Sequence, residues 1–547
     1  MDLTLLQPIA PATELKQALQ DLDISHILTF ADARFTAPTA AAWIERYFCC
    51  DPEEITARSA VLTDVCELCT EESLEQAIAS LAAIRIENEK LNRALSKVDE
   101  VLYAWRRLQA YVHCIDIFTD VFPVRAYTSP RTQALATFFQ ALHEDSQLGA
   151  CRAALEQMDQ LLQLPDYVFL GVNVKEDGSP QELGILGDAV GTSSVNALLC
   201  PRDHTAPSDS LGAEFVYNSN LYGFHFDEYI HRALEKQWKG TLGRANKLLL
   251  ETSLPHLEEM LQLEEPLDFY LVGLRCMNCY TRRGYTLCRP EFHAGGGFFA
   301  KNMKYPELIL HQDHVQGNDI MLHPSDAVII TGANHSGKTS YLKTLGQGYF
   351  LAQLGFFVPS ESLSLTAVTG IYTLFSAGED DSMDASRMGV EIRKLTNILN
   401  HAAASDLVLL NEPMTSTNPV EAVSICADLM QHFLKQGIPH LLVTHLYDIY
   451  FLLRARLGAE DGRHLKSLIT ESYYDEAAHG MVHHYRLREA EPEGNSYARE
   501  TAAAFGITLS AMLPDAHRQA MAAEYCRAHH DNLVYEKEDS HGLSDLR

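Results

Sequence analysis

The residues from Gly332 to Thr339 read GANHSGKT and have the spacing G-x-x-x-x-G-K-[ST] of a phosphate-binding loop. In such a loop, backbone N–H groups surround the phosphates of a nucleotide at the start of a helix. The lysine reaches the β and γ oxygens, and the hydroxyl of the last residue binds Mg²⁺. We therefore expect ATP and Mg²⁺ as ligands. The expected nucleotide-binding residues are Gly332, Ala333, Asn334, His335, Ser336, Gly337, Lys338, Thr339 and Ser340.

The segment LVLLNEP provides a second group of chemically capable residues about 70 positions later. Glu412 is placed to polarise an attacking water. Asn411 stands where an aspartate is usual, so it offers Mg²⁺ an acceptor oxygen, through a water, without the negative charge. Together with Thr339, Asn411 forms the predicted metal site. We expect ATP to bind and its hydrolysis to be slow.

His445 follows the apolar run HLLV and completes the predicted catalytic set. Ligands of α/β proteins gather at the carboxyl ends of parallel strands, where His445 can sense the γ-phosphate. The alternative is an ordinary surface histidine.

The elements that must position these residues are apolar strands and one helix. AVIIT precedes the loop and predicts a buried strand, and TSYLKTLGQGYFLAQL after it predicts a helix. From about residue 305 the pattern is strand, loop, helix, strand, which is typical of an α/β domain.

The preceding half of the chain is mainly helical in pattern. Residues 70–112 have apolar side chains at helical spacing, which predicts one long amphipathic helix or a helical pair. Two strands, DYVFLGVNV and QELGILG, are expected on either side of a hairpin turn, KEDGSP. Helix returns from about 225 to 280. Gly295–Gly297 indicate a flexible junction or a close backbone approach.

Composition limits the class of protein. The chain has 547 residues, 46% hydrophobic and 21% charged, which is typical of a multidomain globular protein. We find neither a membrane-spanning run nor a signal peptide, and expect a cytoplasmic protein.

A net charge of −30 is unfavourable for contact with phosphate backbones, although it leaves a local basic groove possible. The candidate groove surrounds Trp238 and consists of Arg232, Lys236, Lys239, Arg244 and Lys247. A solvated helix face and turn explain these residues equally well.

Cys276, Cys279, Cys288 and His293 could in principle bind zinc. The second pair does not have the C-x-x-C spacing, and the run looks like a helix leading into a strand. We expect buried thiols here and consider zinc unlikely.

The motifs together resemble the MutS family of DNA mismatch-repair ATPases. The similarity lies in VQGNDIML, VIITGANHSGKTSYLKTLGQ, SMDASRMGVEIRKLTNIL, the Walker B-like LVLLNEPMTSTNP and the C-terminal GMVHHYRLREAEPEGNSYARETAAAFGI. It is strong over about 305–510 and weaker over 46–300, and the first 45 residues match nothing in the family pattern. The resemblance implies an α/β P-loop (ABC-type) ATPase domain, preceded by a mainly helical lever region with a small strand-containing insertion.

The resemblance also implies composite sites. In the family, ATPase domains pair head to tail, and a serine of one subunit completes the catalytic site of its partner. That serine corresponds to Ser386, whose alternative role is the N-cap of the following helix.

These patterns divide the chain into six segments. They are an N-terminal segment of unknown role (1–45), a helical lever region (46–165), a strand-containing insertion (166–225), a helical return and connector (226–304), a MutS-type ATPase domain (305–490) and a C-terminal helical segment and tail (491–547).

Two features of the full family pattern are not found, namely a mismatch-reading domain with an aromatic Phe-x-Glu wedge and a C-terminal nuclease domain. We therefore expect a nucleotide-gated homodimer that acts on DNA in mismatch repair or recombination and prefers branched or structured DNA to mismatches. The alternative is a nucleotide-switched protein scaffold with little DNA contact, which the acidic balance favours.

Overall fold

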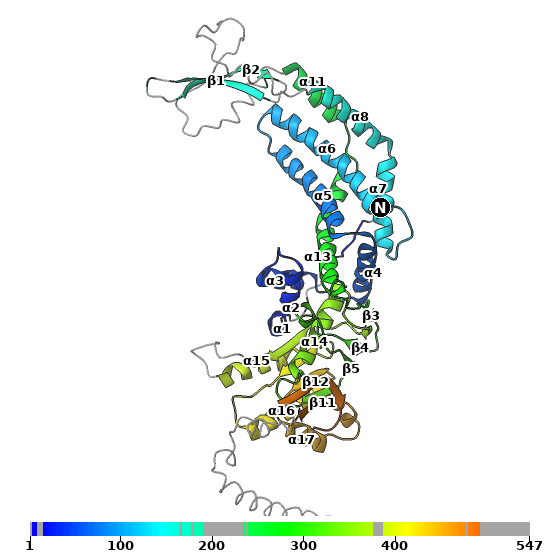
Figure 1. Cartoon of the computed structure of the whole chain (residues 1–547), viewed down its shortest axis with the longest axis vertical. Coiled ribbons are helices and arrows are strands. Elements are labelled where there is room, and N and C mark those ends of the chain that lie inside the picture. Colours follow the sequence, from blue (N-terminus) through cyan, green and yellow to red (C-terminus); the bar gives the residue numbers. More distant parts are fainter. Residues whose placement is uncertain are drawn as a thin grey trace, which may run out of the picture. The chain divides into compact units, whose positions relative to one another are not determined.

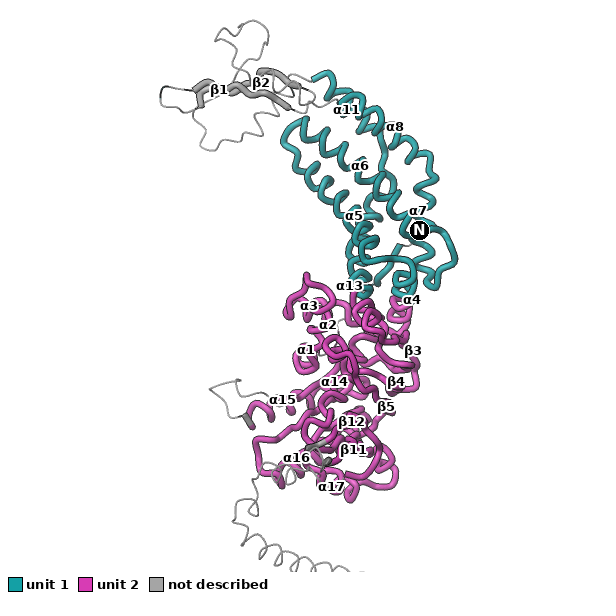
Figure 2. The backbone as a smooth tube through the Cα atoms, viewed as in Figure 1, with its two compact units in different colours: residues 1–7, 60–274 teal, residues 8–59, 275–547 magenta. Residues whose placement is uncertain are grey.

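The computed structural model divides the chain into two compact units, shown in teal and magenta in Figure 2. Unit 1 comprises residues 1–7 and 60–274, and unit 2 comprises 8–59 and 275–547. The structure describes residues 3–7, 12, 15–162, 167–174, 176, 180–189, 235, 239–375, 387–475 and 480–492. Across these residues no helix is both long enough and apolar enough to cross a lipid bilayer.

Unit 1 is built mainly from helices (Figure 1). They are α5 (Glu71–Asn92), α6 (Lys97–Val121), α7 (Pro130–Glu144), α8 (Ser146–Leu161), α11 (Lys239–Glu251) and α12 (Leu257–Leu261), together with parts of α4 (Pro52–Leu68) and α13 (Glu264–Thr281). The apolar spacing over 70–112 thus produces a helical pair, α5 and α6. The basic candidate lies partly on α11, where Lys247 pairs with Glu251 at 3.8 Å; Arg232, Lys236 and Trp238 lie outside the described residues.

The helices of unit 1 begin at capping residues and pack through apolar faces. The Thr70 hydroxyl accepts a hydrogen bond from the Ser73 amide at 3.1 Å, and the Thr70 amide donates one to the Ser73 hydroxyl at 3.0 Å. This satisfies amides that the first turn of α5 leaves without partners. One cluster joins α6, α8 and α11, and its buried members are Val98, Val101, Met158, Leu162, Leu242 and Ala245.

The described part of residues 166–225 contains two paired strands. β1 (Tyr167–Val174) and β2 (Pro180–Ala189) pair antiparallel, with Tyr167 opposite Ala189 and Val174 opposite Pro180. Most residues of the predicted turn between them, and the polar stretch after β2, lie outside the described residues.

Unit 2 contains two sheets and the helices around them. The six-stranded sheet has the order β12-β11-β6-β10-β9-β8, and the four-stranded sheet has the order β3-β7-β4-β5. The strands are β3 (Glu291–Phe292), β4 (Phe298–Met303), β5 (Asn318–Leu322), β6 (Ala327–Thr331), β7 (Ser362–Leu365), β8 (Ile371–Phe375), β9 (Leu407–Asn411), β10 (His440–Val443), β11 (Leu465–Asp475) and β12 (Gly480–Glu489). The helices are α1 (Lys16–Asp21), α2 (Ile24–Ala31), α3 (Ala37–Tyr47), α14 (Lys338–Leu354), α15 (Arg387–His401), α16 (Pro419–Lys435) and α17 (Asp448–Arg456), with short 3-10 turns η1 (Leu308–Leu310) and η2 (Asp461–Arg463).

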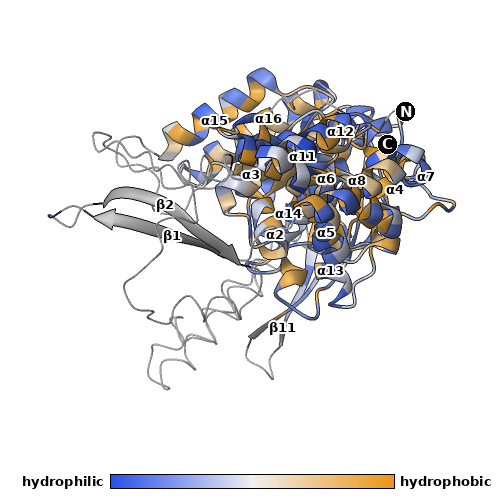
Figure 3. Ribbon diagram, turned by 90° about the horizontal axis from the view of Figure 1, so that it is seen from above, coloured by the Kyte–Doolittle hydropathy of each residue, from blue (hydrophilic) through white to orange (hydrophobic). Residues whose placement is uncertain are grey.

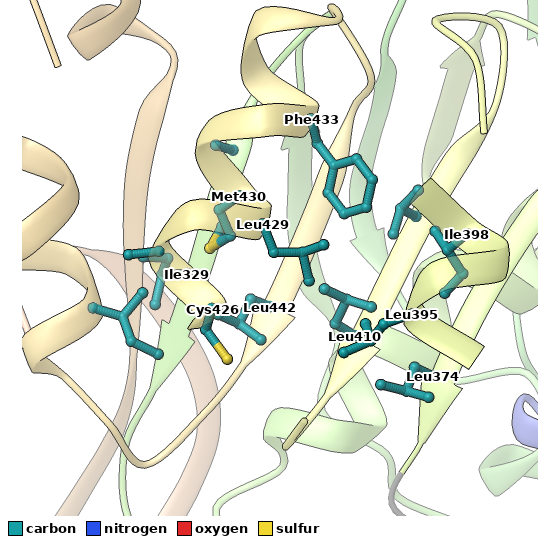
Figure 4. Packing of buried hydrophobic residues seen from close by; sticks show 14 of the residues in the cluster. Ile329, Leu374, Leu395, Ile398, Leu410, Cys426, Leu429, Met430, Phe433 and Leu442 are labelled. Carbon is teal, nitrogen blue, oxygen red and sulfur yellow. The ribbon is translucent and has the colours of Figure 1, made fainter. Parts of the chain in front are cut away.

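The centre of the six-stranded sheet is parallel and covered on both faces. Strands buried on both faces read as continuous apolar runs, which explains AVIIT and LVLL. One face meets α15, α16 and α17, where Leu395, Phe433 and Leu453 pack onto the strands. Figure 4 shows this cluster, and Figure 3 shows hydrophobic and hydrophilic residues alternating along α15.

The helix after the loop, α14, covers the other face, where it packs against β9 and β10. Nearly all of its residues are buried, as expected for a helix surrounded by protein. Gly337 starts it and Gly355 ends it, both with left-handed backbone, at φ of 95° and 86°. A Cβ at Gly355 would lie 2.7 Å from the Cβ of Arg58, so glycine is required there by both conformation and space.

The N-terminal segment, for which the sequence suggested no role, folds as α1–α3. Within unit 2 it contacts α14. The buried side chain of Gln347 donates to the backbone oxygen of Leu22 at 2.7 Å. That of Gln353 donates to the backbone oxygen of Cys49 at 2.8 Å. Two buried amides on one helix thus bind the chain between α1 and α2 and just after α3.

Gly296 and Gly297 allow a close approach rather than acting as a loose hinge. A Cβ on Gly297 would lie 2.6 Å from the backbone oxygen of Leu322, across the β4–β5 pair. The predicted helix followed by a strand is also present, as α13 and β3. Cys276 is buried in α13, and Cys288 forms a backbone bridge with Val358. The part of the chain that is described contains no cluster of three or more His, Cys, Asp or Glu side chains suited to a metal ion.

Candidate nucleotide-binding site

The loop from Gly332 to Gly337 joins the end of β6 to the start of α14. In the parallel sheet, Ile330 pairs with Val443 of β10, and Val443 pairs with Asn411 of β9. These strands therefore end at one edge, directly beside the loop. The sequence predicted a buried strand before the loop and a helix after it, and the structure confirms both.

Lys338 lies inside the loop that precedes it. Its Nζ donates to the backbone oxygens of Gly332 at 2.9 Å and Ala333 at 2.7 Å. Burial lowers the pKa of Lys338, and the charge of Glu412 partly opposes this effect. The ammonium group is thus held over the loop, where the phosphates of a nucleotide would lie.

Ser336 and Gly332 explain why the loop tolerates its unusual sequence. The buried Ser336 hydroxyl donates to the Ala333 oxygen at 2.7 Å and lies 2.7 Å from the hydroxyl of Thr470 on β11. A Cβ at position 332 would lie 1.9 Å from that same hydroxyl, and Gly332 has a φ of 144°. Ser336 therefore braces the loop from inside, and only glycine fits at 332.

The exposed part of the loop is formed by Asn334 and His335. His335 adopts a left-handed backbone with φ of 59°. Both residues are exposed, whereas the hydroxyl pair of Ser336 and Thr470 is buried. Ser340 lies in the first turn of α14, where its backbone oxygen accepts from Thr344 at 2.7 Å.

Thr339 and Asn411, the two metal ligands predicted from the sequence, lie within hydrogen-bond distance of each other. The Thr339 hydroxyl donates to the side-chain oxygen of Asn411 at 2.9 Å. Two oxygens thus stand side by side, and hard cations such as Mg²⁺ prefer oxygen ligands. The donor set fits Mg²⁺ and carries no formal charge.

Glu412 and His445 form a hydrogen bond at the same edge. Glu412 follows the end of β9 with a φ of 52°, and its Oε1 lies 2.8 Å from Nε2 of His445. This hydrogen bond lowers the pKa of Glu412, against the effect of burial, and the Lys338 charge adds to the lowering. Glu412 is consequently ionised at neutral pH, and His445 is its partner rather than an isolated surface residue.

The β11–β12 hairpin adds residues that the local sequence did not identify. A Cβ at Gly337 would lie 3.2 Å from Cδ1 of Tyr485, so this ring borders the loop. His483 lies 2.8 Å from the Ser472 hydroxyl. Burial lowers the pKa of His483, as do the positive charges of His335 and Lys338. His483 and Tyr485 lie in the C-terminal segment that resembles the family, but the resemblance assigned them no role at this site; strand pairing brings them and Thr470 here.

Ser386, the residue expected to act in the partner subunit, lies outside the described residues. The helix that follows it, α15, begins at Arg387 as predicted.

This arrangement defines the class of protein. Unit 2 is an α/β unit with a loop between a parallel strand and a buried helix. A lysine and a hydroxyl next to this loop lie beside an amide and a carboxylate from the end of a neighbouring strand. Residues 328–515 match the family model of MutS domain V. MutS protein homolog 4 of Mus musculus is 26% identical over 317 residues, covering 56% of this chain and 32% of that protein. MutS protein homolog 4 of Homo sapiens is 28% identical over 254 residues, covering 44% of this chain and 27% of that protein.

The match places residues 328–515 of this chain in the MutS family. The chain spans about a third or less of the length of these two relatives. The match to MutS domain V, which is an ATPase domain, covers β6, the loop, β9 and β10.

Proposed function

We propose that the chain is a MutS-like ATPase whose nucleotide state controls a dimer that acts on DNA. The observation that carries the proposal is the convergence of Lys338, Thr339, Asn411 and Glu412 at one edge of the parallel sheet. Family membership supports a role in mismatch repair or recombination.

Each of these residues has a separate task. Lys338 and the backbone amides of the loop bind the β- and γ-phosphates. Glu412, ionised at neutral pH, accepts a proton from the water that attacks the γ-phosphorus as the bond to the leaving ADP oxygen breaks. His445 orients the Glu412 carboxylate through the bond of 2.8 Å.

Thr339 and Asn411 would hold Mg²⁺, directly and through a water respectively. When bound, this ion neutralises charge on the phosphates. Because Asn411 contributes no charge, we infer that the ion is bound more weakly than with an aspartate and that hydrolysis is slow. Ser386 of a partner subunit would complete each site.

The first experiment tests nucleotide binding. Lys338→Ala should reduce ATP affinity strongly while thermal unfolding stays unchanged, since the hydrogen bonds of the side chain go to carbonyls of the loop itself. Lys435→Gln, an exposed cation at the end of α16, is the matched control. Unchanged ATP affinity in folded Lys338→Ala protein would refute the assignment of the loop.

The second experiment tests catalysis. Glu412→Gln removes the base but keeps the size of the side chain, so it should bind ATP and lose turnover, which traps the ATP-bound state. Turnover is measured as phosphate release and binding by equilibrium titration. Robust turnover in this variant would show that another residue is the base.

A scaffold function remains the second candidate, because the net charge of −30 disfavours extensive contact with a phosphate backbone. It predicts that ATP alters binding of a protein partner while duplex, mismatched and branched DNA remain unbound. Gel shift of these DNAs with and without ATP separates the two functions.

A further inference from the structure

The side chains of two histidines border the phosphate loop but take no part in the ATPase chemistry proposed for it. His335 lies in the loop itself, is exposed and has a left-handed backbone with φ of 59°. His483 lies on β12, where it pairs with Ser472 of β11. The loop motif requires neither histidine, because the four positions between its two glycines are unrestricted.

Hydrogen bonds fix the strand of His483 beside the loop. The side chain of Asn318 donates to the Tyr485 oxygen at 2.9 Å and accepts from the Leu487 amide at 3.0 Å. The Tyr485 ring borders Gly337, and its centroid lies 6.0 Å from that of the His483 ring. His483 therefore has a fixed position next to the start of α14.

The surroundings of His483 leave one ring nitrogen available to a ligand. Its Nδ1 lies 2.8 Å from the Ser472 hydroxyl, and within the described residues Nε2 makes no hydrogen bond. β11 presents this hydroxyl, β12 presents the Tyr485 ring, and the loop presents two cations, protonated His335 and Lys338. Burial lowers the pKa of His483, and these two charges lower it further. Cations that repel one another in this way are stabilised when an anion binds among them.

We propose that the imidazoles of His335 and His483 bind the phosphate groups of the nucleotide in their protonated forms. The inference rests on the proposed nucleotide site and adds two ligands to it. Protonated imidazole donates from both ring nitrogens, and charge-assisted hydrogen bonds are roughly twice as strong as neutral ones. The phosphates also offset the repulsion between the histidines and Lys338. ATP binding therefore takes up protons near neutral pH and becomes tighter as the pH falls from 8 to 6.

A metal ion fits the two histidines less well than phosphate does. The charge of Lys338 acts on His483 and would repel a cation there. In the part of the chain that the structure describes, no group of three or more His, Cys, Asp or Glu side chains is suited to a metal. The chemistry of the pair therefore favours an anion.

The test is calorimetric titration of the full chain with ATP and excess Mg²⁺ at pH 6, 7 and 8. Between pH 8 and pH 6, wild-type affinity should rise about tenfold more than that of the double variant His335→Asn, His483→Gln, and about threefold more than that of each single variant. Asparagine tolerates the left-handed backbone at 335. The titration of ATP itself cancels in this comparison. His484→Gln, on the same strand but packed beside Tyr473, is the control and should keep the wild-type pH dependence.

Proton uptake is a readout that a purely structural role of the histidines would not change. Titrations at pH 7 in two buffers with different ionisation enthalpies give the number of protons bound together with ATP. Wild-type protein should take up more protons than the double variant. Should His483→Gln fail to fold, His335→Asn decides, because residue 335 is exposed.

The outcomes separate this inference from the proposed function. If wild-type protein binds ATP and the double variant keeps the wild-type pH dependence and proton uptake, the inference is wrong and the nucleotide site stands. If wild-type protein binds no ATP at any pH, both are wrong. Inorganic triphosphate should reproduce the difference between wild type and double variant. A difference seen with ATP alone would place the histidines at the base and overturn their assignment to phosphate.

Discussion

We propose that residue 411 determines how strongly the candidate site holds Mg²⁺. Its side-chain oxygen already accepts a hydrogen bond from Thr339 at 2.9 Å, so an aspartate at 411 would keep this contact and add a negative charge next to the cation. We predict that Asn411→Asp lowers the Mg²⁺ concentration needed for half-maximal ATP hydrolysis by about tenfold. The measurement is phosphate release as a function of Mg²⁺.

The control for this substitution is Asn400→Asp, an exposed change on α15 outside the catalytic edge. Its Mg²⁺ requirement should equal that of the wild type. An unchanged requirement in Asn411→Asp would show that residue 411 does not face the metal.

His440 makes the stability of unit 2 depend on pH. Burial lowers its pKa to about 4 from the ordinary value of 6.5, and its Nδ1 bonds the backbone oxygen of Ile438 at 2.8 Å. The unfolded chain therefore binds this proton more readily, so stability is complete above pH 6.5 and falls as the pH drops towards 4. The slope is at most about 1.4 kcal/mol per pH unit.

We predict that His440→Phe reduces this acid sensitivity. The His440 ring packs beside Phe433, and a phenylalanine ring at the same position does not titrate. Urea unfolding at several pH values between 7 and 4 measures the slope. His432→Phe, an exposed neighbour, should retain the wild-type slope. Equal slopes in wild type and His440→Phe would contradict the prediction.

At the scale of elements, α14 links the loop to the N-terminal helices. Gln347 donates to the Leu22 oxygen at 2.7 Å and accepts from the Glu307 amide at 3.1 Å. Gln347→Leu leaves both backbone groups without partners, which should cost roughly 2–5 kcal/mol. We predict lower stability and faster proteolysis of the α1–α3 layer.

Gln436→Leu, at the exposed end of α16, is the matched substitution and should leave both properties unchanged. Wild-type stability and wild-type proteolysis in Gln347→Leu would show that the amide does not hold the layer.

At the scale of the whole molecule, the proposed composite sites require two chains. A mixture of Lys338→Ala and Ser386→Ala proteins forms hybrid dimers in which one of two sites has both residues intact. We predict that neither variant hydrolyses ATP alone and that an equal mixture recovers roughly a quarter of the wild-type rate, because half of the dimers are hybrids.

Light scattering provides the independent readout for composite sites. A chain that stays monomeric at all concentrations, with and without ATP, would exclude them.

The expected DNA preference also belongs to this scale. We predict equal affinity for matched and mismatched duplexes and tighter binding of branched junctions, measured by gel shift with and without ATP. A tenfold preference for a mismatch, about 1.4 kcal/mol, would reveal a mismatch-reading element.

The sequence by itself determined the local elements of the site. A strand buried on both faces must be apolar, and a loop that wraps phosphate needs glycines and a lysine at set positions, so β6, α14 and the loop could be located from spacing alone. Periodicity also predicted helix over 70–112, as one helix or a pair, and the strands β1 and β2; the structure shows the pair α5–α6.

The tertiary structure alone decided which distant residues meet. Thr470, His483 and Tyr485 reach the loop because β11 pairs with β6 and β12 with β11, and strand pairing leaves no local signal. The sequence did not distinguish Gln347 and Gln353 from other polar residues of a helix. In the structure both are buried, and their side-chain amides bind backbone oxygens of the α1–α3 segment. Local pattern records which side of an element is buried, whereas the partner that buries it depends on contacts between residues far apart in the chain.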